Sequence, residues 1–98
     1  MAEPDIIAKL KAVEPDLRAG GVAALFIFGS YARGAARPDS DVDVFIDPSD
    51  PASFGLREFI GAYEILRAAL GRPIDYGTRE GLSKYIRRQV EREAVRVF

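Results

Sequence analysis

Two apolar segments separated by a glycine-serine corner constrain the fold of this chain more than any other feature. The first, residues 24–28, is an uninterrupted apolar run that predicts a buried strand, and a Gly-Ser pair ends it abruptly. The second, residues 41–46, carries aspartates at alternate positions of a strand pattern, Asp41 and Asp43. Side chains two apart on a strand share a face, so both carboxylates point the same way. Because neighbouring like charges repel unless a cation lies between them, the pattern predicts a metal site.

A Gly-Ser corner such as Gly29 and Ser30 is usually only a turn, but its combination with the two aspartates indicates an anion-binding site. A short helical turn through Ala32 is expected to start there and to present backbone N–H groups and a hydroxyl to an anion. Arg33 lies one helical turn beyond Ser30, so its guanidinium can reach the same phosphates. Phosphate at the turn and Mg²⁺ at the carboxylates together predict a nucleotide-binding site.

The rest of the chain alternates helical and strand patterns. The expected elements are helices over residues 4–19 and 56–70, strands over residues 23–28, 41–46 and 73–76, and a final helix that Ser83 could cap and that carries Tyr85, Ile86 and Val90. Pro15 is expected to kink or split the first helix, and Gly20-Gly21 to end it. Asp47 is interpreted as the exit turn of the second strand because Pro48 follows it. Residues 94–98 could continue the last helix or form a terminal strand, and the pattern does not decide between them.

This order of elements predicts an α/β (α+β) fold in which a small mixed sheet of three to four strands is flanked by helices. At 98 residues the chain is expected to form a single domain, residues 1–98, with a modest core. The third strand is expected to pair beside the second, which would bring Asp75 close to the two aspartates of that strand.

Composition narrows the chemistry. The formal net charge of −1 gives no sign of duplex nucleic-acid binding, which would require a basic excess. No apolar run approaches 18 residues and no signal-peptide pattern is visible, so neither a membrane span nor secretion is expected. The absence of cysteine excludes disulfides and thiol chemistry and fits a cytoplasmic protein, and the absence of histidine removes the commonest general base. Carboxylate, hydroxyl and guanidinium groups remain, and they suit hard cations and phosphates.

A family resemblance rests on these same residues. Gly29-Ser30, ten residues and then Asp41-Val42-Asp43 resemble the signature of the polymerase-beta-type nucleotidyltransferase superfamily. The fuller strings, residues 28–34 and 37–41, resemble its smallest branch, the MntA-like minimal nucleotidyltransferases. The resemblance implies the nucleotidyltransferase core fold and two Mg²⁺ ions, with ATP as the substrate.

The resemblance also assigns roles to individual residues. Asp41 and Asp43 would ligate both metal ions, and Asp75 would be the third acid that holds the catalytic metal and helps to deprotonate the acceptor. Gly29, Ser30 and Arg33 would bind the triphosphate. Arg37 is a weaker phosphate candidate and could equally be a surface residue. Asp39 and Ser40 are expected to shape the turn into the second strand rather than to bind metal.

The short length of the chain and the family resemblance together indicate the kind of acceptor. The catalytic core occupies the whole chain, so the acceptor is expected to come from another macromolecule or from a second copy. The resemblance implies an antitoxin that places AMP on a tyrosine hydroxyl of a HEPN-domain toxin within a hetero-oligomer. One alternative is a binding module that neutralises its partner by occlusion, with a vestigial nucleotide site. Another is transfer to a small-molecule hydroxyl across a homodimer cleft.

Overall fold

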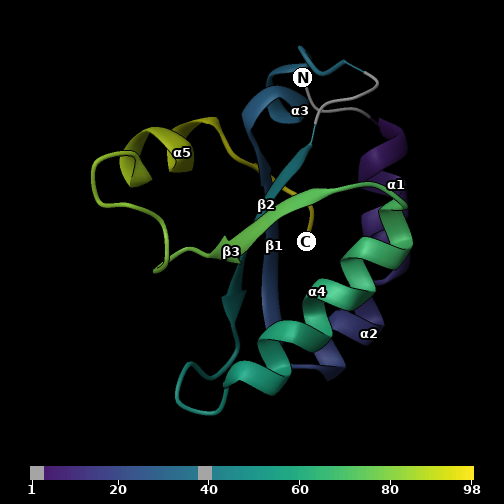
Figure 1. Cartoon of the computed structure of the whole chain (residues 1–98), viewed down its shortest axis with the longest axis vertical. Coiled ribbons are helices and arrows are strands. Elements are labelled where there is room, and N and C mark those ends of the chain that lie inside the picture. Colours follow the sequence, from purple (N-terminus) through teal and green to yellow (C-terminus); the bar gives the residue numbers. More distant parts are fainter. Residues whose placement is uncertain (1–3, 38–40) are drawn as a thin grey trace.

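A mixed four-stranded sheet forms the centre of the computed structural model, which describes residues 4–37 and 41–98 (Figure 1). Along the chain the elements are α1 (Pro4–Ala12), α2 (Glu14–Ala19), β1 (Val22–Phe28), α3 (Gly29–Arg33), β2 (Val42–Pro48), α4 (Leu56–Leu70), β3 (Ile74–Thr78), α5 (Arg87–Glu93) and β4 (Val95–Arg96). Asp39 and Ser40, which were expected to shape the turn into β2, lie outside the described residues. The α/β prediction is confirmed.

The strands lie in the order β3-β2-β1-β4. β1 pairs antiparallel with both β2 and β4, whereas β2 and β3 run parallel, so the sheet is mixed as the sequence predicted. The last residues form a strand rather than an extension of α5. Ala94 ends that helix in an extended conformation, and Leu25 then exchanges backbone hydrogen bonds with Val97 and Phe98.

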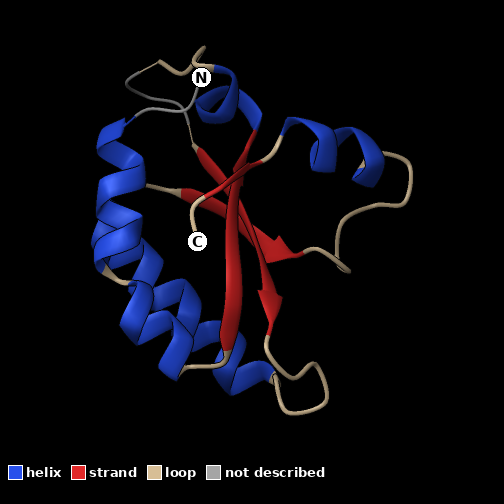
Figure 2. Ribbon diagram, turned by 180° about the vertical axis from the view of Figure 1, so that it is seen from behind, coloured by secondary structure: helices blue, strands red, loops and turns tan. Residues whose placement is uncertain are grey.

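Helices cover the two faces of the sheet unequally. α1, α2 and α4 lie together on one side, and α5 lies on the other (Figures 1 and 2). The helical side holds the core, in which Leu10, Leu17 and Leu66 are fully buried with the inward-facing residues of β1 and β2. This thick layer fixes the sheet and leaves the opposite face for polar residues. In the described part of the chain, none of the helices is both long and apolar enough to cross a bilayer.

The sequence explains how the helices begin and end. The predicted split of the first helix occurs at Val13, and Pro15 then lies in the first turn of α2, where its missing N–H costs no hydrogen bond. α4 begins with the Glu58 carboxylate accepting a hydrogen bond from the Gly55 backbone N–H at 2.9 Å. It ends at Gly71, whose φ of 64° is a left-handed conformation that favours glycine.

Two predicted boundaries are wrong. β2 continues through Asp47 to Pro48, which pairs with Val22 at an irregularity of β1, where a proline is tolerated. Asp47 is therefore a strand residue and not an exit turn. The final helix starts only at Arg87. The preceding residues form turns, in which the Tyr85 N–H donates to Ser83 Oγ and the Arg87 side chain donates hydrogen bonds to the backbone carbonyls of Glu80 and Leu82.

Candidate active site

Asp43 and Asp75 lie side by side at the start of two parallel strands. Asp43 is the second residue of β2 and pairs in register with Asp75, the second residue of β3, while Phe28 lies opposite Asp43 on β1. Neighbouring residues in register project from the same face of the sheet, so the two carboxylates belong to one site. Asp41 directly precedes β2 and is exposed. The predicted pairing of the third strand beside the second is confirmed.

The electrostatics of Asp43 reflect this crowding of acids. Burial raises the pKa of the Asp43 carboxyl, the neighbouring Asp75 raises it further, and Asp41 adds to the effect. Arg33 acts in the opposite direction and lowers the same pKa. The other two predicted acids, Asp41 and Asp75, therefore both lie within electrostatic reach of Asp43. A bound cation would favour the ionised form of Asp43 and relieve the repulsion.

Gly29 is required at the corner by the position of Asp43. Its φ of 71° is left-handed, and a Cβ atom added there would lie 2.1 Å from Oδ2 of Asp43. Any side chain at this position would displace the carboxylate. The missing side chain at Gly29 therefore lets the Asp43 carboxylate lie directly against the turn between β1 and α3. The sequence pattern alone did not show this contact.

The remaining predicted phosphate ligands lie on α3. Ser30 is half-buried at the second position of this helix. Arg33 is exposed, and its Nη1 lies 3.2 Å from Oε2 of Glu93 on α5. The structure brings Arg33 into electrostatic range of Asp43, yet to bind a triphosphate its guanidinium would have to leave Glu93.

Arg72 fixes α3 against the start of β3. Its Nη1 donates a hydrogen bond to the hydroxyl of Tyr31, which is buried within α3, and its guanidinium lies over the same ring. This contact joins the helix that carries Ser30 and Arg33 to the strand that carries Asp75. The two halves of the candidate site are thereby held together.

The donor set suits Mg²⁺ rather than a transition metal. Within residues 4–37 and 41–98, no three His, Cys, Asp or Glu side chains are arranged to hold one ion on their own. Mg²⁺ commonly takes one or two carboxylates and completes its shell with water and substrate phosphates. The crowded carboxylates of Asp43, Asp75 and Asp41, in a chain without histidine or cysteine, fit such a shared site.

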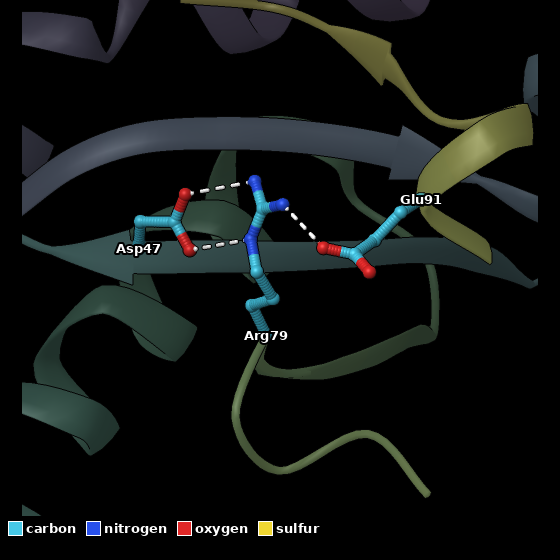
Figure 3. A network of polar contacts seen from close by, with 3 residues as sticks. All are labelled: Asp47, Arg79 and Glu91. Atoms are coloured by element: carbon cyan, nitrogen blue, oxygen red, sulfur yellow. Dashed lines mark hydrogen bonds and ion pairs between the residues drawn. The ribbon is translucent and has the colours of Figure 1, made fainter. Parts of the chain in front are cut away.

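A polar network that the sequence reading missed lies at the other end of the same face. Arg79 donates from Nε and Nη2 to the two carboxylate oxygens of Asp47, each at 3.0 Å, and from Nη1 to Glu91 at 2.6 Å (Figure 3). Its guanidinium also lies 4.9 Å from the ring centre of Phe26 and 5.1 Å from that of Phe45. Strand alternation was the available signal, since it places Asp47 on the face of Asp43. The network ties α5 to the open face of the sheet.

A cavity of about 370 Å³ opens beside Asp75. Phe59 of α4 forms one wall, and Leu82 and Ile86, from the turns before α5, form another. Asp75 and Gly77 of β3 lie along it. The candidate site thus extends from the corner at Gly29 across Asp43 and Asp75 into an apolar cavity.

Comparison with known proteins agrees with this geometry. The family model described as "Nucleotidyltransferase domain" matches residues 4–97. The protein adenylyltransferase MntA of Thermococcus cleftensis is 42% identical over 77 residues, which are 79% of this chain and 76% of that protein. A solved "putative minimal nucleotidyltransferase" has a TM-score of 0.72 and 30% identity, covering 91% of this chain and 93% of its own. A toxin-antitoxin crystal structure with AMP-PNP also has a TM-score of 0.72, covering 94% of this chain and 72% of its own, but at 20% identity it supports the fold alone.

Proposed function

Because the chain belongs to the nucleotidyltransferase domain family, we propose that it transfers AMP from ATP to a hydroxyl of a partner toxin and thereby acts as its antitoxin. The observation that carries this proposal is the in-register pair of Asp43 and Asp75, with Asp41 beside them and the Gly29 corner against Asp43. The adenylyltransferase name of the relative in Thermococcus cleftensis supports the choice of AMP. The toxin-antitoxin description of one structural neighbour suggests the partner.

The reaction would be an in-line displacement at the α-phosphorus of ATP. The acceptor oxygen forms the new P–O bond, and the bond to the bridging oxygen breaks and releases pyrophosphate. The acceptor proton passes to Asp75 or to solvent. When bound, Mg²⁺ would neutralise charge on the phosphoryl oxygens, and Asp41, Asp43 and Asp75 are the residues that would hold two such ions.

The phosphate end of the site follows from the same arrangement. The Ser30 hydroxyl would donate a hydrogen bond to the triphosphate, and Gly29 would let the nucleotide approach the backbone closely. Arg33 would exchange its ion pair with Glu93 for a charge-assisted contact to the phosphates. That exchange is inexpensive, because an exposed ion pair contributes only about 0–1 kcal/mol.

The identity of the partner, the acceptor group and the assembly are proposed from the family resemblance. We propose that the partner is a HEPN-domain toxin, that the acceptor is a tyrosine hydroxyl, and that the two proteins form a hetero-oligomer. We also propose that residues 1–98 act as one minimal nucleotidyltransferase domain in the cytoplasm, which agrees with a chain free of cysteine.

One observation favours a second candidate, the occluding antitoxin. The Arg33 guanidinium, the predicted triphosphate ligand, is engaged by Glu93 in an ion pair. If occlusion is the function, neutralisation of the toxin will survive replacement of both Asp41 and Asp43 by Asn. If transfer is the function, neutralisation will be lost while binding remains.

The test of the main proposal is the intact mass of both proteins after reaction. The chain is incubated with the product of the neighbouring gene as the candidate toxin, together with Mg²⁺ and each of the four NTPs in turn. We expect one or more AMP units on the toxin with ATP, and none with the Asp43→Asn variant. Asp16→Asn makes the same chemical change at an exposed position of α2 and should leave transfer intact. No mass gain on either protein despite a stable complex would contradict the proposal.

A further inference from the structure

Exposed apolar side chains lie on α4, the helix whose Phe59 lines the cavity beside Asp75. On α4, Leu56, Ile60 and Tyr63 follow one another at helical spacing, and all three are exposed. The Tyr63 ring lies 5.9 Å from that of Tyr76, which lines the cavity. Ile86, also exposed, lines the same cavity. We call the cavity and these exposed residues the β3-edge surface.

The location of this surface matches what an in-line reaction requires. The Gly29 corner follows β1 and lies on one side of Asp43, whereas β3 and Asp75 lie on its other side. In an in-line displacement the attacking and leaving oxygens lie on opposite sides of the phosphorus. If pyrophosphate leaves toward the corner, the acceptor hydroxyl must approach from the side of Asp75. The β3-edge surface lies on that side, because Asp75, Gly77 and Thr78 of β3 line its cavity.

We propose that the acceptor protein docks on the β3-edge surface with an apolar segment, which enters the cavity and brings its hydroxyl to Asp75. This inference rests on the proposed function and adds the place and the chemistry of partner recognition. β3 is an edge strand, so the backbone along its outer side is open to a partner.

The extent and charge of the surface favour a protein over other occupants. A nucleobase needs only a small enclosed pocket, whereas the apolar side chains of this surface are open to solvent, and Leu56 is 73% exposed. Basic residues outnumber acidic ones between residues 80 and 88, with Lys84 and Arg88 exposed. We therefore expect acidic residues beside the apolar segment of the partner.

The test measures binding and transfer separately, with the neighbouring-gene toxin as the probe. The variants Ile86→Glu and Ile60→Glu place a charge at exposed positions of the β3-edge surface, where folding is expected to be retained and is checked by circular dichroism. Ala68→Glu is the matched control, because Ala68 is exposed on α4 and does not line the cavity. Calorimetry gives the Kd of each variant for the toxin and for ATP, and intact mass gives transfer.

We expect the Kd for the toxin to rise about tenfold or more in both surface variants, because a charge in the apolar centre of an interface removes its main anchor. The Kd for ATP should stay unchanged, and Ala68→Glu should bind the toxin like the wild type. An unchanged Kd for the toxin in both variants would overturn the docking proposal. Two other results would also overturn it. Loss of ATP binding in the surface variants would assign the surface to the nucleotide, and loss of self-association would assign it to a second copy of the chain. A wild type that binds the toxin through this surface but transfers nothing would refute the proposed reaction and leave the docking inference standing.

Discussion

The two faces of β2 show how one strand serves both stability and chemistry. Val42, Val44 and Ile46 point to the helical layer and are at most 1% exposed. The residues between them, Asp43 and Asp47 with the buried Phe45, lie on the other face, which α5 and Arg79 partly cover. Because strand side chains alternate, a functional acid can lie one residue from the core without entering it. We therefore expect substitutions of adjacent residues in β2 to affect different properties: stability on the packed face and activity on the other face.

The open face nevertheless has its own means of stabilisation. Phe26 and Phe45 stack with their ring centres 4.8 Å apart, and the Arg79 guanidinium lies over both rings. Its two carboxylate partners, Asp47 and Glu91, come from β2 and α5. The packed face is therefore held mainly by apolar contact, with a hydrogen bond from the Tyr76 hydroxyl of β3 to the Phe59 carbonyl of α4, whereas the open face is held by a cation between rings and acids.

The largest expected effect is on the packed face. Val44→Asp would place a carboxylate among fully buried apolar side chains, at a cost of about 3–5 kcal/mol. A domain of this size has about 5–15 kcal/mol of stability, so we expect most of it to be lost. Urea unfolding followed by circular dichroism measures the change. A Val44→Asp variant as stable as the wild type would contradict the assignment of the two faces.

At Asp43, one residue before Val44, we expect a substitution to lower activity rather than stability. Asp43→Asn removes a charge that would hold metal in the transition state, and we expect AMP transfer to fall about a thousandfold. The fold should be retained, because Asn fits the same space. Initial rates by intact mass, with melting temperatures of both proteins, test this. Activity near the wild-type level would remove Asp43 from the reaction.

A smaller effect is expected at the Arg79 network. Arg79→Met keeps an apolar stem over the rings but loses both ion pairs, and we expect a loss of about 1–2 kcal/mol. The segment before α5 should become more open, so trypsin should cut at Lys84 faster than in the wild type. Arg88→Met, at a neighbouring exposed position, is the control. Equal proteolysis of the Arg79→Met variant and this control would show that the network does not hold α5.

The smallest expected effect is the pH dependence that Asp43 contributes. Its pKa is raised in the folded state, so the folded chain binds this proton more tightly than the unfolded chain does. The resulting stabilisation is present below about pH 4 and is lost as the pH rises through the raised pKa. In EDTA at pH 7 the Asp43→Asn variant should therefore be slightly more stable than the wild type, by less than about 1 kcal/mol.

Urea unfolding of the two proteins at several pH values measures this difference. It should shrink toward acid pH, where the wild-type carboxyl is also neutral. Added Mg²⁺ should stabilise the wild type and leave Asp43→Asn unchanged. A difference that stays constant with pH would contradict the crowding of acids around Asp43.

The sequence predicted the parts of the molecule that depend on local pattern. The strands, the short helix after Gly29 and the split at Pro15 follow from apolar runs, glycines and proline, and the structure confirms them. The extension of β2 through Asp47 could not be predicted in the same way, because its partner Arg79 lies 32 residues away. The late start of α5 likewise depends on contacts of the Arg87 side chain. The structure brings the predicted site residues to one end of the sheet, and their chemical roles stay predictions.

A crystal structure of the chain with Mn²⁺ and AMP-PNP would test directly whether the aspartates bind metal and the Gly29-Ser30 corner binds the triphosphate. Mn²⁺ accepts the oxygen ligands of Mg²⁺ and is located by its anomalous scattering, and a chain without histidine or cysteine offers it few competing sites. We predict anomalous peaks about 2.1 Å from carboxylate oxygens of Asp43 and its neighbours Asp41 and Asp75, with the triphosphate at the Gly29-Ser30 corner. Peaks located elsewhere, or a triphosphate bound away from that corner, would contradict the account.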